Sequence, residues 1–472
     1  MQCRLEETKV LDRSSTSIAA FLLVLTGLFH TPAGSAFAAD PQSRPLVEYV
    51  KKPDASYHWT KVGGGTVGKA QYVELLLTSQ TWKDIVWKHQ LFVIKPDNVD
   101  PAATQAILMV TGGDWHAELE KSGRKPNLPP DSQFLALVAS QLREPLAVLL
   151  DVPFQPIFGG KEEDGIIAFT FDKFLVTGDA DWPVLLPMVK SAVRAMDAVQ
   201  AFSKKEWTLD IKKFTVTGAS KRGWTTWLTG AVDSRAAGII PMVFDTLNMR
   251  PQAKLQVTSF GAFSDQVNDY TVLHLQERMN TPPGEALRNI VDPYAYLEML
   301  KLPKLLMMGT NDAYWPLEAA NLYWNDLLGE KYLLYVPNNG HGLDDFRRVI
   351  GSVLAFQEHV AQGKPLPKLK WQFERDASSL HLVVESNLKP KSVVAWTATA
   401  KSRDFRGSKW SSEPARHENG TYRFDLPVPA EGFAAAFGEA TFANGVLPYF
   451  LSTNVRIVGK TDKVPVASKL GQ

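Results

Sequence analysis

Residues 214–228 change from a strand pattern to a helix pattern within a single turn, and this feature limits the possible folds more than any other. The β-branched run Phe214-Thr-Val-Thr leads into Gly218-Ala-Ser220-Lys-Arg-Gly223, and a helix-compatible stretch, Trp224 to Leu228, follows. A sharp strand-to-helix turn raises a serine hydroxyl above a parallel sheet, at a helix N-terminus. Backbone N–H groups and the helix dipole favour negative charge there. We therefore expect Ser220 to be a nucleophile.

An acid and a histidine follow Ser220 in the chain, each after a predicted strand. Lys304 to Gly309 reads as a buried strand that ends shortly before Asp312, and Lys331 to Val336 reads as a strand that precedes His341. Catalytic groups of open α/β sheets gather beyond the carboxyl ends of the strands. Ser220 would attack a carbonyl, His341 would take and return its proton, and Asp312 would fix the imidazole tautomer.

Asp245 is the alternative for the acid. It follows another predicted strand, Ile239 to Phe244, and lies between the nucleophile and His341 in the chain. We favour Asp312 as the acid and keep Asp245 as a second candidate, which could also contact the substrate.

The runs ahead of Ser220 predict the rest of the sheet. Short apolar runs are typical of parallel strands buried on both faces, and helical spacing separates them. The alternation predicts an α/β fold, a doubly wound, mostly parallel sheet of the α/β-hydrolase type. The predicted elements are an antiparallel pair, Tyr72 to Thr78 and Ile85 to Lys95; parallel strands Ala106 to Thr111 and Leu146 to Leu150; and helices Ser132 to Leu142 and Leu185 to Phe202.

The strand that ends at Thr111 leads into a glycine-rich loop, Gly112-Gly113-Asp114-Trp115. In this fold, the corresponding loop and the residue after the nucleophile supply the N–H donors of an oxyanion hole, and glycine permits close approach of the backbone. We assign this role to the N–H groups of Gly113, Asp114 and Lys221. Trp115 and His116 follow directly and are expected to contact the substrate.

The Lys221 side chain has two interpretations. Its ammonium group could stabilise an oxyanion or bind an acidic group of the substrate. The simpler interpretation, which we adopt, is a solvated lysine on the first turn of a helix.

The first 38 residues are predicted to be a signal peptide. An apolar run, Ile18 to Phe29, is followed by helix breakers and by Ala36-Phe37-Ala38, an A-x-A cleavage pattern. The run is shorter than the roughly 20 residues of a membrane span. We expect cleavage after Ala38 and export to the periplasm or the medium.

Composition excludes several classes of site. The single cysteine, Cys3, lies in the predicted leader, so the mature chain would have no disulfide, thiol nucleophile or cysteine metal site. A net charge of +1 gives no basic surplus for nucleic acid. The run Gly63 to Ala70 resembles a phosphate-binding loop but lacks the final Ser or Thr, and we interpret it as a glycine-rich turn. We expect no cofactor and no metal.

Two insertions and a change of pattern divide the chain further. Residues 153–183 and 248–303 are longer than sheet connections require and are predicted to cap the site, since long loops at that edge are often lids. In the second insertion, Pro282-Pro283 is expected to break two helical patterns. Residues 39–365 would form the catalytic domain. Residues 366–465 lose helical periodicity and predict an all-β, immunoglobulin-like sandwich, which would cover one flank of the hydrolase or bind a partner or carbohydrate.

Six runs together resemble the PhoPQ-activated pathogenicity-related proteins. The resemblance implies an α/β-hydrolase fold, export and a serine hydrolase centre at Ser220, Asp312 and His341, and it implies no substrate. Arg222 departs from the usual Gly-x-Ser-x-Gly pattern, so the turn should differ slightly. The runs are Asp151-Val-Pro153, Gln155-Pro156, Leu185 to Gln200, Thr217 to Trp224, Gly309 to Pro316 and Asn339-Gly-His341.

Two other groups of hydrolases share features with the chain. Glucuronoyl esterases are similar in having a basic residue after the serine and a glycine at the third position, as in Lys221 and Gly223, which favours a polar or acidic ester. Serine exopeptidases of this fold hold a substrate amine with carboxylates. The acidic run Glu162-Glu163-Asp164 could do so, although a solvated acidic loop is the simpler interpretation.

The sequence therefore predicts an exported serine hydrolase that cleaves an ester or amide bond through an acyl-enzyme. The substrate would be a small molecule, a peptide or a saccharide ester. A serine exopeptidase of the same fold is one alternative, and a secreted binding protein that has lost turnover is another. The sequence indicates no particular oligomeric state.

Overall fold

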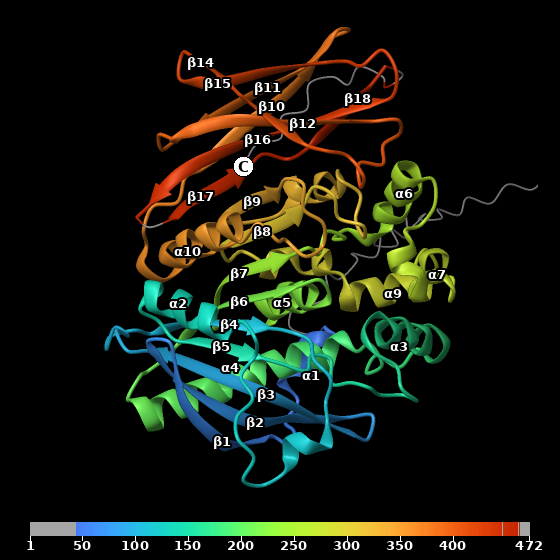
Figure 1. Ribbon diagram of the computed structural model, residues 1–472. Helices are drawn as coiled ribbons and strands as arrows, with labels where there is room; N and C mark the ends of the chain where they lie inside the picture. Colours follow the sequence, from blue (N-terminus) through green and yellow to red (C-terminus); the bar gives the residue numbers. More distant parts are fainter. Residues whose placement is uncertain (1–43, 446, 461, 463–472) are drawn as a thin grey trace, which may run out of the picture. The chain divides into compact units, whose positions relative to one another are not determined.

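The structure, a computed structural model, describes residues 44–445, 447–460 and 462 (Figure 1). The predicted signal peptide and its cleavage site after Ala38 lie outside these residues. Within the described part of the chain, no helix is long and apolar enough to cross a membrane.

A central sheet of nine strands organises the fold, in the order β1-β2-β3-β5-β4-β6-β7-β8-β9 (Figure 1). The first four strands in this order pair antiparallel, and β5, β4, β6, β7, β8 and β9 run parallel. The predicted antiparallel pair and the mostly parallel sheet are therefore confirmed. The strands are β1 (His58–Val67), β2 (Ala70–Trp82), β3 (Ile85–Pro96), β4 (Gln105–Val110), β5 (Leu146–Leu149), β6 (Lys213–Ala219), β7 (Ala236–Met242), β8 (Lys304–Gly309) and β9 (Lys331–Val336).

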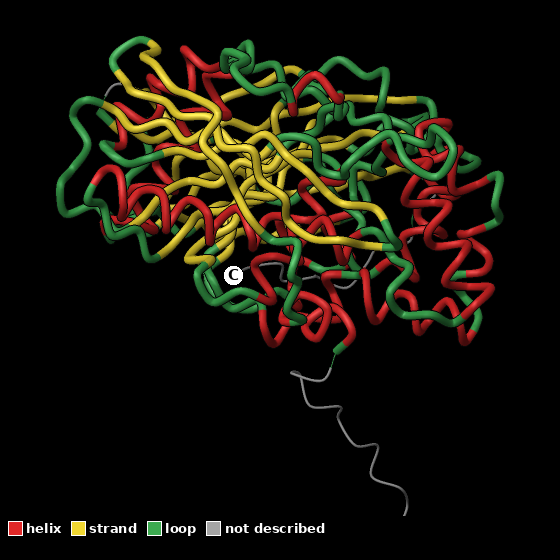
Figure 2. Tube along the Cα trace, turned by 90° about the horizontal axis from the view of Figure 1, so that it is seen from below, coloured by secondary structure: helices red, strands yellow, loops and turns green. Residues whose placement is uncertain are grey.

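Helices cover both faces of the sheet (Figure 2). Successive side chains of a strand point to opposite faces. Leu91 and Val93 of β3 belong to the larger apolar core, to which α4 and α5 contribute, while Phe92 and Ile94 pack in a second core with α2. The covering helices are α1 (Pro45–Lys51), α2 (Ser132–Leu142), α4 (Leu185–Trp207), α5 (Lys221–Val232) and α10 (Phe346–Gln362).

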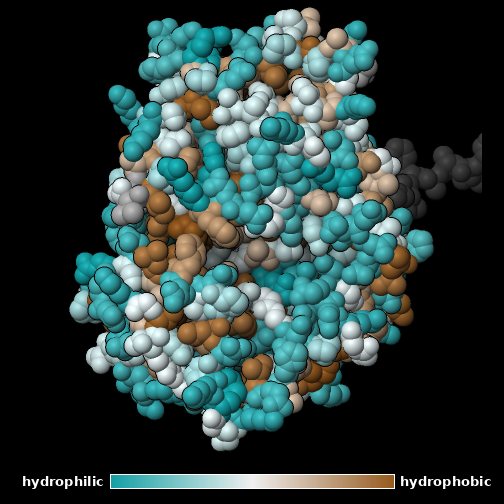
Figure 3. Space-filling view, viewed as in Figure 1, coloured by the Kyte–Doolittle hydropathy of each residue, from teal (hydrophilic) through white to brown (hydrophobic). Residues whose placement is uncertain are grey.

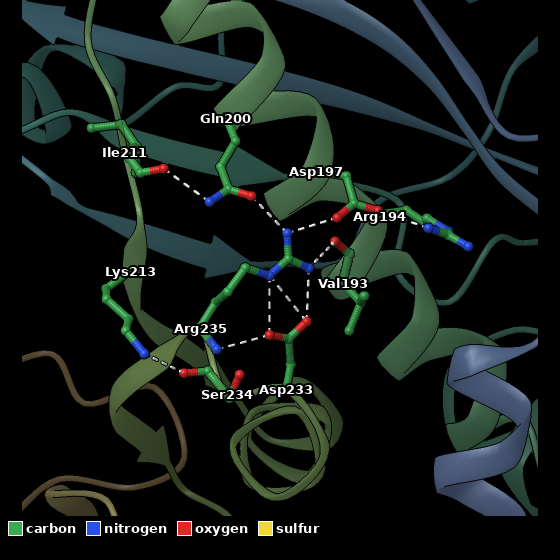
Figure 4. Close-up of polar contacts among 9 residues, drawn as sticks. All are labelled: Val193, Arg194, Asp197, Gln200, Ile211, Lys213, Asp233, Ser234 and Arg235. Carbon is green, nitrogen blue, oxygen red and sulfur yellow. Dashed lines mark hydrogen bonds and ion pairs between the residues drawn. The ribbon is translucent and has the colours of Figure 1, made fainter.

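Arg235 fixes α4 to the turn between α5 and β7 (Figure 4). Its guanidinium contacts Asp197 Oδ1 at 2.6 Å, Asp233 Oδ2 at 2.7 Å and Gln200 Oε1 at 2.8 Å. Because Arg235 comes directly before a parallel strand, this network lies at the amino ends of the strands, away from Ser220. It anchors the sheet rather than the site.

The interpretation of residues 63–70 as a glycine-rich turn was wrong, because Gly63 to Gly65 lie inside β1. The strand pairs with β2, with a register shift between Lys61 and Gly63. At Gly64, a Cβ would lie 2.5 Å from Tyr72 O. The glycine therefore allows the two strands to approach, and the turn itself is formed at Gly68, with φ +57°.

Both insertions contain helices, and they pack against each other. The first forms α3 (Glu163–Thr177), which contacts α7, α8 and α9 of the second. The helical pattern is interrupted before Pro282-Pro283, as expected: one helix ends at Arg278 and the next, α9, begins at Pro282. This first position of a helix suits proline, and the Thr281 side chain accepts a hydrogen bond from Gly284 N. The second insertion comprises α6 (Met249–Phe260), α7 (Asn268–Thr271), α8 (Leu275–Arg278), α9 (Pro282–Val291) and 3-10 turns at Asp265–Val267 and Pro293–Met299.

After α10 the chain forms two antiparallel sheets, called here the C-terminal sheets. A Cβ at Gly438 would lie 3.1 Å from Val384 and 3.3 Å from Leu382, so β16 of one sheet packs closely on β11 of the other. The described elements after α10 are all strands, whereas the sandwich domain, its immunoglobulin-like type and the boundary at residue 365 stay predictions. One sheet is β10 (Leu369–Arg375), β11 (Ser379–Ser386), β15 (Thr421–Pro427) and β14 (Arg416–Glu418); the other is β13 (Ser411–Pro414), β12 (Ser392–Ala400), β16 (Phe433–Asn444) and β17 (Leu447–Ser452), with β18 (Arg456–Gly459) paired to β16.

The face shown in Figure 3 is mostly hydrophilic, with hydrophobic residues in scattered patches. Scattered exposed apolar residues of this kind are common on protein surfaces.

Candidate active site

Ser220 occupies a strained turn between β6, which ends at Ala219, and α5, which begins at Lys221. Its φ is +57° and its ψ −126°, a combination that costs free energy in a residue with a side chain. The hydrogen bond from Ser220 N to Met242 O, 2.9 Å long, holds this conformation. The turn places Ser220 at the carboxyl edge of the parallel strands, as the sequence predicts.

Two glycines allow the turn to close, and they explain the departure at Arg222. A Cβ at Gly218 would lie 2.7 Å from Arg222 O, and one at Gly223 would lie 2.7 Å from Met242 O. The close approaches are thus made at positions 218 and 223, and position 222 can carry a long side chain.

His341 and Asp312 are hydrogen-bonded to each other. The distance from His341 Nδ1 to Asp312 Oδ2 is 2.8 Å, and the other carboxylate oxygen, Oδ1, accepts a hydrogen bond of 2.7 Å from Tyr314 N. The Tyr314 ring stacks on the imidazole, with 4.2 Å between the ring centroids. A carboxylate beside Nδ1 favours the tautomer with its hydrogen on Nδ1, which leaves Nε2 as an acceptor.

The Nε2 atom of His341 is buried and has no hydrogen-bond partner among the described residues. The structure therefore brings His341 and Asp312 together, but it does not show a hydrogen bond between His341 and Ser220. Such bonds are often long in ligand-free sites and tighten only when the substrate is bound.

Asp245 lies apart from the histidine. Its carboxylate is buried and accepts a hydrogen bond of 2.7 Å from Tyr323 OH. Burial raises the pKa of Asp245 to about 7, and the nearby charge of Asp312 adds to this rise. Of the two candidate acids, Asp312 is the one that contacts His341.

The loop after β4 packs against the turn at Ser220 (residues 218–223), called here the elbow, and against the loop after β5. A Cβ at Gly112 would lie 2.3 Å from the Arg222 guanidinium, and one at Gly113 would lie 2.4 Å from Asp151 Oδ1. Gly113 also has a φ of +147°. A side chain at either position would displace Arg222 or Asp151, and at position 113 it would also require a strained backbone.

The expectation that Lys221 is solvated was wrong. Its side chain is only 8% exposed, and Nζ lies 2.8 Å from Glu163 Oε2 and 3.2 Å from Asp164 Oδ2. Asp164 Oδ1 also accepts a hydrogen bond from Tyr270 OH. The lysine folds back onto the first insertion because α3 begins there with two carboxylates.

Arg222 binds the same glutamate. It donates through Nη1 to Glu163 Oε2 at 2.7 Å and through Nη2 to Glu163 Oε1 at 2.6 Å, and its Nε donates to Val152 O at 2.5 Å. Burial alone would raise the pKa of Glu163, but the hydrogen bonds and charges of Arg222 and Lys221 outweigh it and hold this pKa at about 2. Glu163 is therefore an ionised partner of two cations, although its side chain remains 38% exposed.

Gln155 joins this ion-pair cluster to the glycine-rich loop. Its Nε2 donates to Asp114 Oδ1 at 3.0 Å and to Glu163 Oε1 at 2.8 Å, while its Oε1 accepts from Glu163 N at 2.9 Å. A second contact, from Trp115 N to Gln155 O, is 2.8 Å long. The loop, the elbow and the first insertion thus form one connected polar network.

A cavity of about 140 Å³ opens at Ser220. It lies between the elbow, both insertions and the loop after β8, and most of its lining is apolar or aromatic. Of the predicted site residues, Ser220 and Lys221 line it. The residues that line it from the insertions and the β8 loop include Asp164, Phe171, Met249, Arg250, Tyr270, Met279, Tyr314 and Trp315.

Several predicted substrate contacts lie elsewhere. His116 and Glu162 are exposed and do not line the cavity, and Trp115 packs against Phe154, with 5.8 Å between the rings. Gly113, Asp114 and Asp245 are also absent from its lining. Asp245 in particular is too buried to meet a substrate. The described residues contain no cluster of three or more His, Cys, Asp or Glu side chains that could hold a metal ion.

Two asparagines that were not predicted from the sequence hold the loops of Asp312 and His341. Asn311 Nδ2 donates to Ser408 O at 2.7 Å and to Arg406 O at 3.1 Å, and Asn338 Nδ2 donates to Trp410 O at 3.0 Å. The only signal in the sequence was their position, since each lies two residues after the end of a predicted strand and precedes a candidate catalytic residue by one to three positions.

Comparisons with known proteins identify the family. The family model of the PhoPQ-activated pathogenicity-related protein matches residues 46–406. Autocrine proliferation repressor protein A of Dictyostelium discoideum is 32% identical over 438 residues, which cover 85% of this chain and 86% of that protein.

The chain is also similar to solved structures. An acetyl xylan esterase from Paenibacillus sp. R4 gives a TM-score of 0.43 at 14% identity, over 63% of this chain and 86% of that one. An S-formylglutathione hydrolase from Agrobacterium tumefaciens gives 0.41 at 12% identity, over 64% and 99%. The match over residues 46–406 and the extent of the identity with the Dictyostelium relative show that the chain belongs to the PhoPQ-activated pathogenicity-related protein family.

Proposed function

We propose that the chain is a serine hydrolase of the α/β-hydrolase type that cleaves an ester bond through an acyl-enzyme. Ser220 is the nucleophile, His341 the base and Asp312 the acid. The single observation that carries the proposal is the hydrogen bond of 2.8 Å between His341 Nδ1 and Asp312 Oδ2 at the sheet edge where Ser220 occupies its positive-φ turn.

The reaction begins when Ser220 Oγ attacks the ester carbonyl carbon and His341 Nε2 takes the hydroxyl proton. Asp312 stabilises the imidazolium that forms and remains ionised. The tetrahedral intermediate collapses, the C–O bond to the alcohol breaks, and His341 returns the proton to the leaving oxygen. Water then attacks the acyl-enzyme, with His341 again as the base, and releases the acid and free Ser220.

The negative oxygen of the intermediate requires hydrogen-bond donors that are already in place. The first N–H groups of a helix have no partner within the helix, and Lys221 N is such a donor. We assign the second donor to the backbone of Gly113 or Asp114, whose loop is held by Arg222 and Gln155. Loss of one donor typically raises the barrier by about 3–4 kcal/mol.

The polar network favours an ester over the substrate of an exopeptidase. An amine-binding site requires free carboxylates, but Glu163 is bound by Lys221 and Arg222. Asp164 is bound by Lys221 and Tyr270. The chain's own Lys221 thus occupies the place that a substrate ammonium would take.

A binding protein without turnover is the second candidate, and one observation favours it. The unpaired Nε2 of His341 means that no base contacts the nucleophile in this conformation. A fluorophosphonate probe separates the two candidates, because it reacts only with an activated serine.

The probe should label the wild-type protein at Ser220, and Ser220→Ala should abolish labelling. Ser234→Ala is the matched control, since Ser234 is exposed at the opposite end of the sheet and should not affect labelling. A parallel panel of acyl esters and aminoacyl amides then reports the bond that is cleaved. Absence of labelling and of ester turnover would favour the binding protein.

We further propose that the enzyme is exported, on the basis of Ala36-Phe37-Ala38. N-terminal sequencing of the mature protein should begin at Ala39. Recovery of Met1 in the mature protein would contradict cleavage.

A further inference from the structure

One wall of the cavity at Ser220 is a continuous series of aromatic rings. Trp224 stacks on Phe244 with 4.9 Å between centroids, Phe244 meets Trp315 at 5.9 Å, and Trp315 meets Tyr314 at 5.9 Å. The indole N–H groups are already bonded, from Trp224 Nε1 to Val291 O at 2.5 Å and from Trp315 Nε1 to Val243 O at 3.0 Å. The wall therefore offers apolar ring faces that are fixed in place.

Three charged residues line this cavity, and two of them neutralise each other. Lys221 and Asp164 form an ion pair of 3.2 Å. The third, Arg250, is exposed at the start of α6, and its side chain has no ion pair or hydrogen bond with any other described residue. The cavity thus combines an aromatic wall, the candidate nucleophile Ser220 and a guanidinium that is not paired with a carboxylate of the described residues.

We propose that this cavity binds a substrate whose bulky apolar or aromatic group carries an anion, and that Arg250 binds that anion. The inference rests on the proposed function only in that the cavity opens at Ser220. A guanidinium forms paired hydrogen bonds with carboxylate, phosphate or sulfonate groups. A cavity of similar size, ~150 Å³, accepts a benzene ring in another protein.

We assign anion binding to Arg250 rather than to Lys221. The Lys221 ammonium is already paired with carboxylates, whereas the Arg250 guanidinium is not. To bind an anion, the Lys221 ammonium would have to leave Glu163 and Asp164. Glu163 would keep its contacts with Arg222, but Asp164 would keep only the hydrogen bond from Tyr270. Arg250 loses only water. The sequence suggested that Lys221 could bind an acidic group of the substrate. The proposal gives this role to Arg250, a residue of the second insertion.

Equilibrium binding tests the proposal without any turnover. In the Ser220→Ala background, calorimetric titration compares hydrocinnamate with hydrocinnamamide, which has the same shape and no charge. Hydrocinnamate should bind about tenfold more tightly, the effect of one charge-assisted hydrogen-bonded contact. Arg250→Gln should remove this preference and leave amide binding unchanged, and Arg250→Lys should restore part of it.

Lys254→Gln provides the matched control. Lys254 is exposed one turn further along α6 and does not line the cavity, so its loss should leave the preference intact. Phenylethanesulfonate and phenethyl phosphate identify the kind of anion, since a carboxylate site and a phosphate site would rank the three probes differently. The preference should fall as salt is added, because screening weakens exposed charge pairs.

Three results would overturn the proposal: no binding of either probe, equal binding of acid and amide, or an unchanged preference in Arg250→Gln. Failure of the proposed hydrolase is a separate result, because it appears as absent fluorophosphonate labelling in the wild-type protein. A protein that binds hydrocinnamate through Arg250 and does not react with the probe would keep this inference and lose the enzyme.

Discussion

Asn338 and Trp410 exchange two hydrogen bonds: Asn338 Nδ2 donates to Trp410 O at 3.0 Å, and Trp410 N donates to Asn338 Oδ1 at 2.7 Å. Asn338 lies three residues before His341, in the loop after β9. Asn311, next to Asp312, binds Ser408 O in the same connection between β12 and β13. The C-terminal sheets therefore hold both the acid loop and the histidine loop.

Asn311→Ala should have a large effect on kcat in addition to its effect on the thermal stability of the fold. The variant loses the hydrogen bonds from Asn311 Nδ2 to Phe405 O, Arg406 O and Ser408 O. It also loses the one that Asn311 Oδ1 accepts from Thr310 Oγ1, and it releases the loop that carries Asp312. A misplacement of about 1 Å can cost about a hundredfold in rate, so we expect a loss of kcat of roughly ten- to a hundredfold. Ester hydrolysis and thermal unfolding measure the two effects.

Asn321→Ala is the control for this prediction. Asn321 also bonds the C-terminal sheets, from its Nδ2 to Val455 O at 3.0 Å, but it lies away from the catalytic loops. Its Oδ1 also accepts a hydrogen bond of 2.6 Å from Asn454 Nδ2. Loss of the side chain should therefore destabilise the fold by about 2 kcal/mol, as for two hydrogen bonds, and leave kcat near the wild-type value. Equal kcat in the two variants would show that the C-terminal sheets only cover the hydrolase.

Glu163→Gln should disturb both the elbow and the glycine-rich loop, since Glu163 binds Arg222, Lys221 and Gln155. Because the folded-state pKa of Glu163 is about 2, below its ordinary value of 4.5, its ionised form stabilises the fold above pH 4.5. This stabilisation is lost as the pH falls towards 2. The Tm of Glu163→Gln should therefore be lower than that of the wild type at pH 7, and the difference should shrink at pH 3.

Glu162, the residue before Glu163, provides the control for that experiment. Glu162 is exposed, so Glu162→Gln should alter Tm little at either pH. In the same samples, Glu163→Gln should lose kcat while Glu162→Gln keeps it. If the Tm difference of Glu163→Gln were the same at pH 7 and pH 3, the ion-pair cluster would not be its cause.

Asp312→Asn should lower kcat by about ten-thousandfold, by analogy with triads that lose their acid. The asparagine keeps the shape of the side chain but cannot stabilise an imidazolium. Asp245→Asn should leave most of the activity, since Asp245 binds Tyr323 and not His341. The opposite order of activities would assign the acid role to the loop after β7.

The sequence predicted those parts of the fold that depend on local pattern. Helix α2 begins at Ser132 and ends at Leu142 as expected. The glycines on either side of Ser220 likewise predict the turn there. The surroundings of Lys221 were predicted wrongly, because its partners lie 57 and 58 positions earlier in the chain, at Asp164 and Glu163. Periodicity carries no information about such contacts between distant loops.

The same limit applies to the histidine loop and its support. The order of Ser220, Asp312 and His341 follows from strand order, which a sequence reports well. The bonds of Asn338 to Trp410 join positions that are 72 residues apart, and neither loop has a repeating pattern. Arg250 was overlooked for a related reason: its place on the cavity depends on how α6 packs against the elbow.

The pH dependence of stability should change when Asp245 is replaced. Burial raises its folded-state pKa to about 7, whereas an unfolded aspartate titrates near 3.8. Between these values the folded protein holds a proton that the unfolded chain has lost, so the contribution of Asp245 makes stability fall as the pH rises from 4 to 7. Asparagine does not titrate, and its Oδ1 can still accept the hydrogen bond from Tyr323.

Asp245→Asn should therefore resemble the wild type in stability at pH 4 and exceed it at pH 8. Urea unfolding at pH 4, 6 and 8 measures the difference, and Asp210→Asn, which replaces an exposed acid, should show no such gain. The gain must develop below pH 7, because above the folded-state pKa both states carry the charge and the difference becomes constant. A variant that is less stable than the wild type at pH 8 would mean that the ionised carboxylate is favourable in its pocket, contrary to the burial that surrounds it.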